Sequence, residues 1–223
     1  MSKKNINIIF DFDSTIIQLE TIEVLADFAL KNIRDKNTIL KNIKNITSNA
    51  MAGKISFDKA LTNRISLLSI NKSHIHDTMK YLKKKLTKSF FDNLDYIEDN
   101  IVNCFVISGG FKEIISPILT PYGFRKENIY ANSFIYNKGG VVVGVDNKNP
   151  LSKDKGKNII AKNIKGFNII VGDGYTDYEI KKYKNAKIFI LFIENIFRKE
   201  LSNNADFIAK NFKETFNFIK NVT

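Results

Sequence analysis

Short apolar runs alternate with amphipathic segments along most of the chain, an order typical of a domain built on a parallel β-sheet. Residues 6–10 are apolar at nearly every position and rich in isoleucine, which predicts a strand buried on both faces of such a sheet. Further strands are predicted at residues 101–107, 129–136, 141–145, 167–171, 187–191 and 206–209. Helices are predicted at residues 111–119, 155–163, 176–184 and 212–219, with a bend or break at Pro117. The fold class expected from this pattern is α/β, a Rossmann-like parallel sheet flanked by helices.

A long helical pattern interrupts the alternation directly after the first strand. Four groups of apolar residues repeat at helical spacing, starting at Ile22, Ile39, Phe57 and Ile75. Gly53 and the polar residues 69–73 separate some of these groups. We therefore expect an α/β core made of residues 1–18 and 87–223, with a small helical cap inserted at residues 19–86.

The formal net charge of +12 raises the question of nucleic-acid binding. The lysines are scattered along the whole chain, and the one dense cluster, Lys83-Lys84-Lys85, falls late in an amphipathic segment where cations favour a helix C-terminus. No helix-turn-helix or aromatic RNA-binding pattern is present in the sequence. We expect a solvated basic surface that steers an anionic substrate as a secondary effect, and no nucleic-acid partner.

The sequence also indicates the class of protein and its compartment. Its 223 residues are enough for one large domain or a domain with a small insertion. No apolar segment approaches the roughly 18 to 20 residues that span a bilayer, so we expect a cytoplasmic protein without a membrane partner. Cys104, the single cysteine, lies in an apolar run and is expected to be a buried thiol rather than a nucleophile.

Two carboxylates one residue apart, Asp11 and Asp13, follow the first strand. Ligands of open α/β sheets bind beyond the carboxyl ends of the strands, where side chains at i and i+2 of an extended segment face the same way. Paired carboxylates suit a divalent cation, and one of them can act as a nucleophile. The motif alone is equally compatible with a polar turn that caps a helix.

Three later loops carry groups that complement a phosphate or a metal. Ser108-Gly109-Gly110 offers a hydroxyl and exposed backbone N–H groups, although Gly-Gly after a strand is often only a turn. Lys155 stands near a helix start among the competing cations Lys153 and Lys157. The loop 172–177 has two acids one helical turn apart, of which the second also suits the first turn of a helix.

Taken together and in order, these motifs resemble a known family. Asp11-Phe12-Asp13-Ser14-Thr15, Ser108-Gly109-Gly110, Lys155 and the loop 172–177 are similar to the four motifs of the haloacid dehalogenase-like phosphohydrolases. Within that superfamily the chain resembles the phosphoserine phosphatase group. The residues that carry this narrower resemblance are Glu20, Met51, Phe57, Arg64 and Phe111.

The resemblance implies a two-step phosphoryl transfer. Asp11 would attack phosphorus and become an aspartyl phosphate, while Asp13 would protonate the leaving oxygen and then deprotonate the attacking water. Mg²⁺ is the implied cofactor; its implied ligands are Asp11, Asp173 and the backbone carbonyl of Asp13, with Asp177 supporting the site. The groups implied to bind or assist the phosphoryl oxygens are Ser108, the Gly109 N–H, Lys155 and Thr176.

The same resemblance assigns substrate choice to the cap. Glu20 would pair with the ammonium of phosphoserine and Arg64 with its carboxylate, since a guanidinium grips a carboxylate with two hydrogen bonds. Met51 and Phe57 are implied lid residues, although their helical spacing is equally typical of core packing. The implied partner is therefore a small phosphomonoester, O-phosphoserine.

The leading hypothesis is a Mg²⁺-dependent phosphoserine phosphatase that completes serine biosynthesis, as a monomer or homodimer. A phosphatase for another small phosphomonoester, or a phosphotransferase to an alcohol such as homoserine, is the alternative. A basic interaction protein with vestigial acids is disfavoured because every acid of the four motifs is present, together with Glu20 and Arg64.

Overall fold

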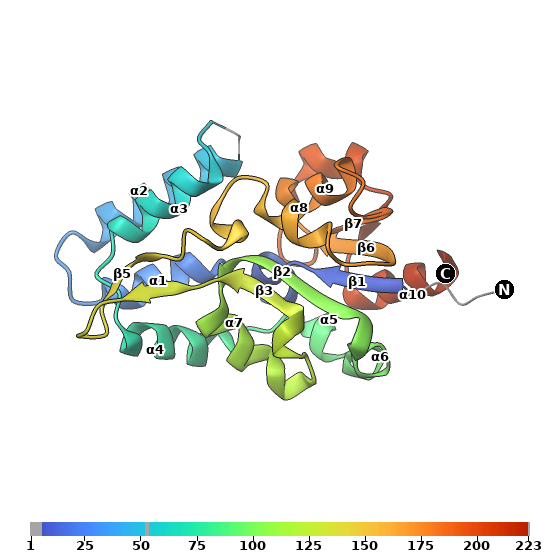
Figure 1. The fold of residues 1–223 in the computed structure, drawn as a ribbon, viewed down its shortest axis with the longest axis horizontal. Helices are drawn as coiled ribbons and strands as arrows, with labels where there is room; N and C mark the ends of the chain where they lie inside the picture. Colours follow the sequence, from blue (N-terminus) through green and yellow to red (C-terminus); the bar gives the residue numbers. More distant parts are fainter. Residues whose placement is uncertain (1–5, 52–53, 223) are drawn as a thin grey trace.

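The structure, a computed structural model, describes residues 6–51 and 54–222, except for the side chain of Met51. Six parallel strands form the main sheet in the order β3-β2-β1-β6-β7-β8, so β1 and β6 lie at its centre (Figure 1). The bounds of these strands are β1 Ile6–Phe10, β2 Cys104–Phe111, β3 Ile129–Asn132, β6 Phe167–Gly172, β7 Ile188–Phe192 and β8 Phe207–Ala209. The predicted fold class, a Rossmann-like parallel sheet between helices, is confirmed.

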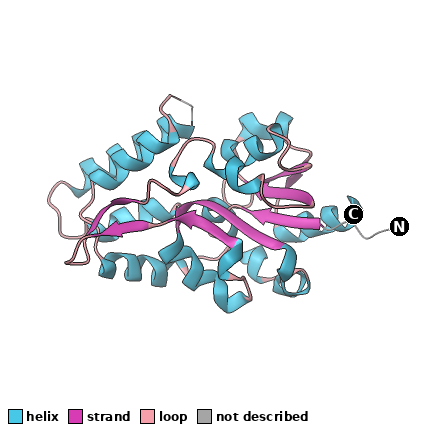
Figure 2. Cartoon of the chain, viewed as in Figure 1, coloured by secondary structure: helices cyan, strands magenta, loops and turns pink. Residues whose placement is uncertain are grey.

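Helices cover both faces of the sheet (Figure 2). Those of the α/β core are α5 Lys88–Phe91, α6 Leu94–Asp99, α7 Lys112–Leu119, α8 Gly156–Ala161, α9 Tyr175–Lys182 and α10 Phe212–Val222. Successive strand residues point to opposite faces: Ile8 and Phe10 join the cluster that includes α7 and α10, whereas Ile9 joins the cluster under α8 and α9. Each strand of the sheet centre is therefore buried on both sides, as its unbroken apolar run predicts.

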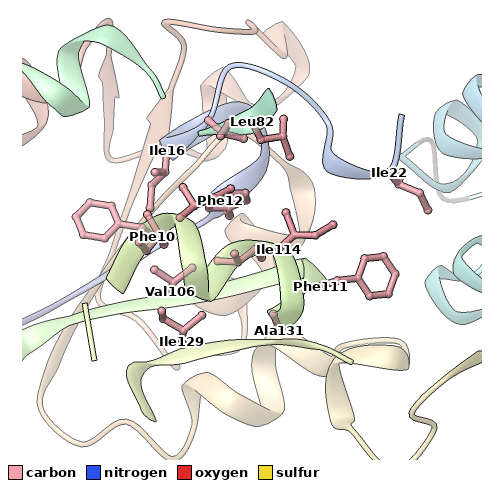
Figure 3. Packing of buried hydrophobic residues seen from close by; sticks show 14 of the residues in the cluster. Phe10, Phe12, Ile16, Ile22, Leu82, Val106, Phe111, Ile114, Ile129 and Ala131 are labelled. Atoms are coloured by element: carbon pink, nitrogen blue, oxygen red, sulfur yellow. The ribbon is translucent and has the colours of Figure 1, made fainter. Parts of the chain in front are cut away.

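The larger cluster is rich in phenylalanine and continues into the inserted segment. Phe10 contacts the rings of Phe124, Phe212 and Phe216 at centroid distances of 6.4, 5.9 and 6.4 Å. Figure 3 shows residues of this cluster on the first strand and its turn close to residues of the second and third strands and of α7. Leu82, from the inserted segment, belongs to the same cluster, so the insertion and the α/β core share apolar contacts.

The inserted segment is helical, as predicted, and forms α1 Thr21–Ala29, α2 Lys36–Met51, α3 Phe57–Ser66 and α4 Lys72–Leu82. Figure 1 shows α2 and α3 standing away from the sheet, while α4 lies beside α7, which it contacts. The break expected at Gly53 lies outside the described residues. The division into a core of residues 1–18 and 87–223 and a cap of residues 19–86 stays a prediction.

The two chain crossings between the α/β core and this insertion run side by side. Ile17 and Leu86 form an antiparallel bridge, Thr87 N–H donates to the Ile16 carbonyl at 2.9 Å, and Gln18 N–H donates to the Lys85 carbonyl at 2.9 Å. A short strand pair, β4 Phe134–Tyr136 and β5 Val142–Val145, contacts the insertion from the core side. Val142 N–H donates to the Ile70 carbonyl at 2.8 Å.

Three predicted elements differ in detail. The strand expected at 101–107 begins at Cys104 and continues to Phe111, so Ser108-Gly109-Gly110 belongs to β2 and not to a loop after it. The run 129–136 was expected to be one strand, but it divides at Ser133 into β3 of the main sheet and β4 of the separate pair. Pro117 lies inside α7, which continues through it to Leu119, so the helix is not broken at the proline. Within the described residues, no helix is both long and apolar enough to cross a membrane.

Candidate active site

The carboxyl ends of β1, β2 and β6 open into a cavity of about 120 Å³ that lies against the insertion. The sequence-predicted site residues that line it are Asp11, Asp13, Glu20, Phe57, Arg64, Ser108, Gly109, Asp173 and Thr176. Asp177 lies next to it, with a carboxylate oxygen within 4.8 Å of the carboxylates of Asp11 and Asp173. Residues from four separate stretches of sequence are therefore brought together at the strand ends, as expected for an open α/β sheet.

Asp11 is fixed at the end of the first strand by its neighbours. Its N–H donates to the Val171 carbonyl at 2.9 Å, and its Oδ1 accepts from Phe12 N–H at 2.8 Å. The chain then makes a wide helical turn, Phe12–Ile16, closed by Ile17 N–H donating to the Phe12 carbonyl at 3.0 Å. Asp11 is only 8% exposed, yet it lines the cavity, so its carboxylate faces a site that is nearly dry.

Asp13 is held by the first residue of α1. Its Oδ1 accepts from Thr21 N–H at 3.1 Å and also from the Thr21 hydroxyl. Burial, and then the negative charge of Glu20, raise the pKa of Asp13 well above its usual range, although the Thr21 hydroxyl opposes this. A carboxyl group with a raised pKa carries the proton that a general acid must donate.

Lys157, not Lys155, is the lysine of the site. Its Nζ lies 2.9 Å from Asp11 Oδ1 and 2.7 Å from Asp177 Oδ1. Burial alone would lower the pKa of Lys157, but the two carboxylates favour the charged form more strongly, so the pKa is raised. Lys155 is exposed and its Nζ lies 5.1 Å from the centroid of the Tyr183 ring. The prediction of Lys155 is therefore corrected: the backbone before α8 turns its side chain outward, and two residues later Lys157 points to the strand ends.

The three clustered aspartates share a small buried volume. Burial, and then the charge of Asp11, raise the pKa of Asp173 to about 7 and that of Asp177 to about 8. Gly172 makes room for this arrangement, because a Cβ at that position would lie 2.4 Å from the Asp177 carboxyl group. Asp177 also accepts from Gly174 N–H at 3.1 Å, so it caps the N-terminus of α9 from the first turn and belongs to the acid cluster at the same time.

This cluster fits a hard divalent cation. The acidic groups in and around the cavity are Asp11, Asp13, Glu20, Asp173 and Asp177, and the cationic groups are Arg64, Lys157 and Arg198. Among the described residues of the site, five carboxyl groups thus face three cationic groups. A bound divalent cation would relieve the repulsion among the carboxylates. The side chain of Asp13 faces Thr21 instead, so a metal contact through its backbone carbonyl stays a prediction.

Ser108, Gly109 and Gly110 lie near the end of β2, where its pairing with β3 is irregular, and they line the same cavity as Asp11; this segment is called the glycine loop below. Ser108 is buried, and its Oγ accepts from Gly110 N–H at 2.9 Å, which leaves the hydroxyl proton outside this contact. The Asn132 side-chain amide donates to the Gly109 carbonyl at 2.9 Å and fixes the loop from β3. Hydroxyl and loop together form a cradle of the kind that binds an anion.

The side of the cavity that the inserted segment lines presents one acid, Glu20, and one guanidinium, Arg64. Arg64 is 8% exposed, and it donates from Nε to the Ala60 carbonyl at 3.1 Å and from Nη1 to Thr47 Oγ1 at 3.3 Å. Burial lowers its pKa despite the attraction of Glu20. None of the ion pairs found in the described part of the chain engages Arg64. A buried guanidinium without a carboxylate partner is poised to receive one from a ligand.

Comparison with known proteins identifies the family of this site. The sequence profile of the haloacid dehalogenase-like hydrolase family matches residues 8–180. The phosphoserine phosphatase of Methanocaldococcus jannaschii is 31% identical over 207 residues, which cover 90% of this chain and 91% of that protein. The chain belongs to the haloacid dehalogenase-like hydrolases.

Solved structures agree with this assignment. The crystal structure of a phosphoserine phosphohydrolase-like protein from Francisella tularensis subsp. tularensis SCHU S4 matches this hydrolase with a TM-score of 0.86 at 33% identity, over 96% of this chain and 99% of that one. A phospho-aspartyl intermediate analogue of phosphoserine phosphatase matches with a TM-score of 0.76 at 26% identity, over 97% and 99% of the two chains. The resemblance to this family and to its phosphoserine phosphatase group is confirmed, and so is the prediction of a phosphoric monoester hydrolase.

Two further side chains complete the site of this hydrolase: Arg198, which the sequence did not single out, and Ser14, which belongs to the first motif but was given no role there. Arg198, from the loop after β7, donates from Nε to Asp173 Oδ2 at 2.9 Å, and its Nη2 lies 4.0 Å from Glu20 Oε1. Ser14 Oγ donates to the same Glu20 oxygen at 2.8 Å. Arg198 stands in a stretch without glycines or paired acids, so no local pattern marks it, and only the fold shows that it contacts two residues of the cavity wall, Asp173 and Glu20.

The remaining sequence prediction for this hydrolase concerns the lid residues. Phe57 lines the cavity, and its ring contacts Gly109: a Cβ on that glycine would lie 3.0 Å from Phe57 Cζ. The side chain of Met51 lies outside the described residues, so its lid role stays a prediction.

Proposed function

We propose that this hydrolase removes the phosphoryl group from O-phospho-L-serine to give L-serine, with Mg²⁺ as cofactor and an aspartyl phosphate on Asp11 as intermediate. One observation carries the proposal: a single small cavity is lined by two sets of groups. Asp11, Asp13 and the glycine loop are suited to phosphoryl transfer, and Glu20 together with Arg64, which has no carboxylate partner, is suited to binding an amino acid. Phosphoserine has the matching three groups, because its phosphate, ammonium and carboxylate all project from a three-carbon skeleton.

The position of each group supports a two-step displacement. The Asp11 carboxylate attacks phosphorus and displaces the seryl oxygen, which takes a proton from Asp13. Asp13 then accepts a proton from water as the water attacks the aspartyl phosphate, releasing phosphate and restoring Asp11. The raised pKa of Asp13 supports its role as proton donor in the first step.

The remaining residues of the site bind the phosphoryl group and align it with Asp11. Lys157 neutralises negative charge beside Asp11, and Ser108 with the Gly109 N–H holds phosphoryl oxygens, as phosphoryl transfer relies on alignment and charge neutralisation. Asp11, Asp173 and Asp177 are the residues that would hold Mg²⁺. When bound there, the ion supplies positive charge that favours the ionised carboxylates and the transferring phosphoryl group.

Substrate selection follows from the cap side of the cavity. Glu20, held by Ser14, pairs with the ammonium group, and Arg64 pairs with the carboxylate. Thr176 lines the same cavity and assists with the phosphate. On this proposal the enzyme catalyses the last step of serine biosynthesis in the cytoplasm, as a monomer or homodimer.

Phosphate release from L-phosphoserine, with and without Mg²⁺, tests the proposal. The comparison substrates are O-phosphoethanolamine, which lacks the carboxylate, and 3-phosphonooxypropionate, which lacks the amino group. We expect phosphoserine to be preferred and Mg²⁺ to be required. Equal or better turnover of either truncated substrate contradicts the assigned substrate, and Mg²⁺-independent turnover contradicts the cofactor.

Variants assign the two ends of the substrate. Arg64→Ala should lower kcat/KM for phosphoserine by about 10²-fold, the order expected when a buried charge loses its partner, but should change the value for phosphoethanolamine little. Glu20→Gln should also lower kcat/KM for phosphoserine, but it should change the value for 3-phosphonooxypropionate little, because that substrate has no ammonium group. Addition of homoserine, followed by a search for phosphohomoserine, separates hydrolysis from transfer to an alcohol.

A further inference from the structure

A hydrogen bond connects the α/β core to the cap beside the phosphoryl site. Asp154 lies in the core loop before α8, and its Oδ1 accepts from the backbone N–H of Phe57 at 2.7 Å, although the two residues are 97 positions apart. Phe57 is the first residue of α3. The carboxylate of a core residue therefore binds the N-terminus of a cap helix.

The N-terminus of α3 needs such a partner. The first N–H groups of any helix have no acceptor within the helix, and a serine before the first turn commonly supplies one. Ser56 occupies that position, but its side chain makes no capping hydrogen bond. The Asp154 carboxylate provides the acceptor from across the domain boundary, and its negative charge suits the positive end of the helix dipole.

Two groups of the candidate site depend on where α3 begins. The Phe57 ring packs on Gly109 so closely that a Cβ there would lie 3.0 Å from Cζ. Arg64 follows seven residues later on the same helix, about two turns along it, and lines the cavity. A shift of the N-terminus of α3 away from the core would therefore move both the cover of the glycine loop and the guanidinium.

The same loop also supplies the lysine of the site. Lys157 follows Asp154 by three residues and lies 2.9 Å from Asp11. Phe57, Gly109 and Lys157 line a narrow extension of about 30 Å³ beside the main cavity. One core segment thus contacts both the proposed nucleophile, through Lys157, and the first residue of α3, through Asp154.

We infer that Asp154 is a positioning residue, which holds the N-terminus of α3 so that Phe57 covers the glycine loop and Arg64 faces the cavity. Asp154 touches no reacting atom, so it acts through α3. The inference rests on the proposed function for its choice of substrate, whereas the contact itself is testable without any substrate.

Hydrogen exchange at the Phe57 amide tests the contact directly. Three variants of the full chain are compared with the parent: Asp154→Ala, Asp154→Asn, whose side-chain carbonyl can still accept, and Asp77→Ala, which removes an exposed acid from α4 as a charge-matched control. We expect exchange at Phe57 N–H to accelerate about five-fold or more in Asp154→Ala and to remain near the parent rate in the other two. Unchanged exchange in Asp154→Ala overturns the inference, whatever the substrate proves to be.

Steady-state kinetics then test positioning. In Asp154→Ala the KM for phosphoserine should rise about five-fold with kcat within two-fold of the parent, because a smaller fraction of the enzyme holds α3 in its binding position. Asp154→Asn should restore most of the loss, and phosphoethanolamine, with no carboxylate for Arg64, should show a smaller change. Faster Phe57 exchange with unchanged KM on the preferred substrate overturns the positioning role. If phosphoserine is not hydrolysed at all, the proposed function fails, and the exchange measurement still decides whether Asp154 holds α3.

Discussion

Two lysines separated by a single glycine have opposite surroundings in this hydrolase. Lys157 is buried between Asp11 and Asp177, whereas Lys155 has a positive φ of 59° and an exposed side chain near Tyr183. Among Lys153, Lys155 and Lys157, the Lys-Gly-Lys pattern of the family favours Lys155 in the sequence. The left-handed backbone at Lys155, which decides the outcome, is rare outside glycine and leaves no mark in the local sequence.

Substitution of the two lysines should separate their roles. We expect Lys157→Ala to lower kcat/KM by at least about 10²-fold, since it removes a preorganised positive charge next to the nucleophile, and Lys155→Ala to stay within about two-fold. The measurement is phosphate release at matched enzyme concentration, with circular dichroism to show that both variants are folded. A larger loss for Lys155→Ala than for Lys157→Ala would return the role to Lys155.

The acid cluster should make the effect of Mg²⁺ depend on pH. Burial and mutual repulsion raise the pKa of Asp173 to about 7 and that of Asp177 to about 8, so without metal both carboxyl groups are largely protonated at pH 6. At these two carboxyl groups the folded state binds protons more tightly than the unfolded state. The stability that the bound protons add to the metal-free enzyme is fully present below pH 4 and is lost as the pH rises to about 8. A divalent cation binds the ionised forms, so it offsets this loss.

Thermal unfolding at pH 6, 7 and 8 measures the effect. We expect the rise in Tm on adding Mg²⁺ to grow from pH 6 to pH 8, and Asp177→Asn to reduce that growth. A Mg²⁺-induced shift that is equal at all three pH values, or largest at pH 6, contradicts the assignment of these aspartates to the metal. Ca²⁺ at the same concentration shows whether the effect is general for divalent cations.

At the scale of elements, the sequence predicts the strands and helices whose apolar residues follow a clear pattern over many positions. The central strands follow directly from unbroken apolar runs, and the four helices of the insertion follow from their 3.6-residue period. The short helices α5 Lys88–Phe91 and α6 Leu94–Asp99 escaped prediction because one or two turns show too little of that period. The run 129–136 divides between two sheets because Glu113, far from it in sequence, accepts from Phe134 N–H at 2.9 Å.

The residues of the candidate site divide in the same way, into those that the sequence pattern predicts and those that only tertiary packing brings in. Asp11 and Asp13 follow β1, Ser108 and Gly109 lie near the end of β2, and the loop 172–177 begins at the end of β6, so topology alone gathers them at one edge. Arg198, by contrast, contacts Asp173 and Glu20 only through tertiary packing.

Packing between the loop before α8 and the helix itself gives a prediction for this element. A Cβ on Gly156 would lie 2.2 Å from the Pro150 carbonyl oxygen, which is backbone and has little freedom to move. Gly156→Ala should therefore lower the free energy of unfolding by about 1–3 kcal/mol, or more if the loop cannot shift. Urea unfolding measures the change.

Gly144 provides a matched control. It lies in β5, where a Cβ would meet nothing within 4 Å, so Gly144→Ala should change the free energy of unfolding by less than about 0.5 kcal/mol. Equal effects of the two substitutions would mean that the close approach at Gly156 is absent in solution. Loss of activity in Gly156→Ala beyond its loss of stability would indicate displacement of Lys157.

At the scale of the whole molecule, the core is continuous from the sheet into the insertion. Phe10, Leu25, Leu82 and Phe216 belong to one buried cluster, although they come from the first strand, the cap and the last helix. Cys104 lies in the same cluster at the start of β2. Its exposure therefore requires the opening of the central sheet rather than of a loop.

The Cys104 thiol should report global unfolding. Burial raises its pKa to about 12, so at pH 8 the folded enzyme holds it as the unreactive neutral thiol, whereas the unfolded chain carries an appreciable fraction of thiolate. We expect a disulfide reagent to label the native enzyme at least about 10²-fold more slowly than the urea-unfolded chain. Rapid labelling of the native enzyme at the rate of free cysteine would show that the sheet opens locally.

The adjacent chain crossings at Ile17 and Leu86 have a consequence for how such enzymes diversify. Because the chain leaves and re-enters the core at hydrogen-bonded neighbours, the intervening segment closes a loop whose ends are already together. Its length and sequence can change without altering the distance that the core must bridge. Selection, or an engineer grafting a different insert between these two residues, can therefore exchange the segment to which we assign substrate choice while the residues at the strand ends stay in place.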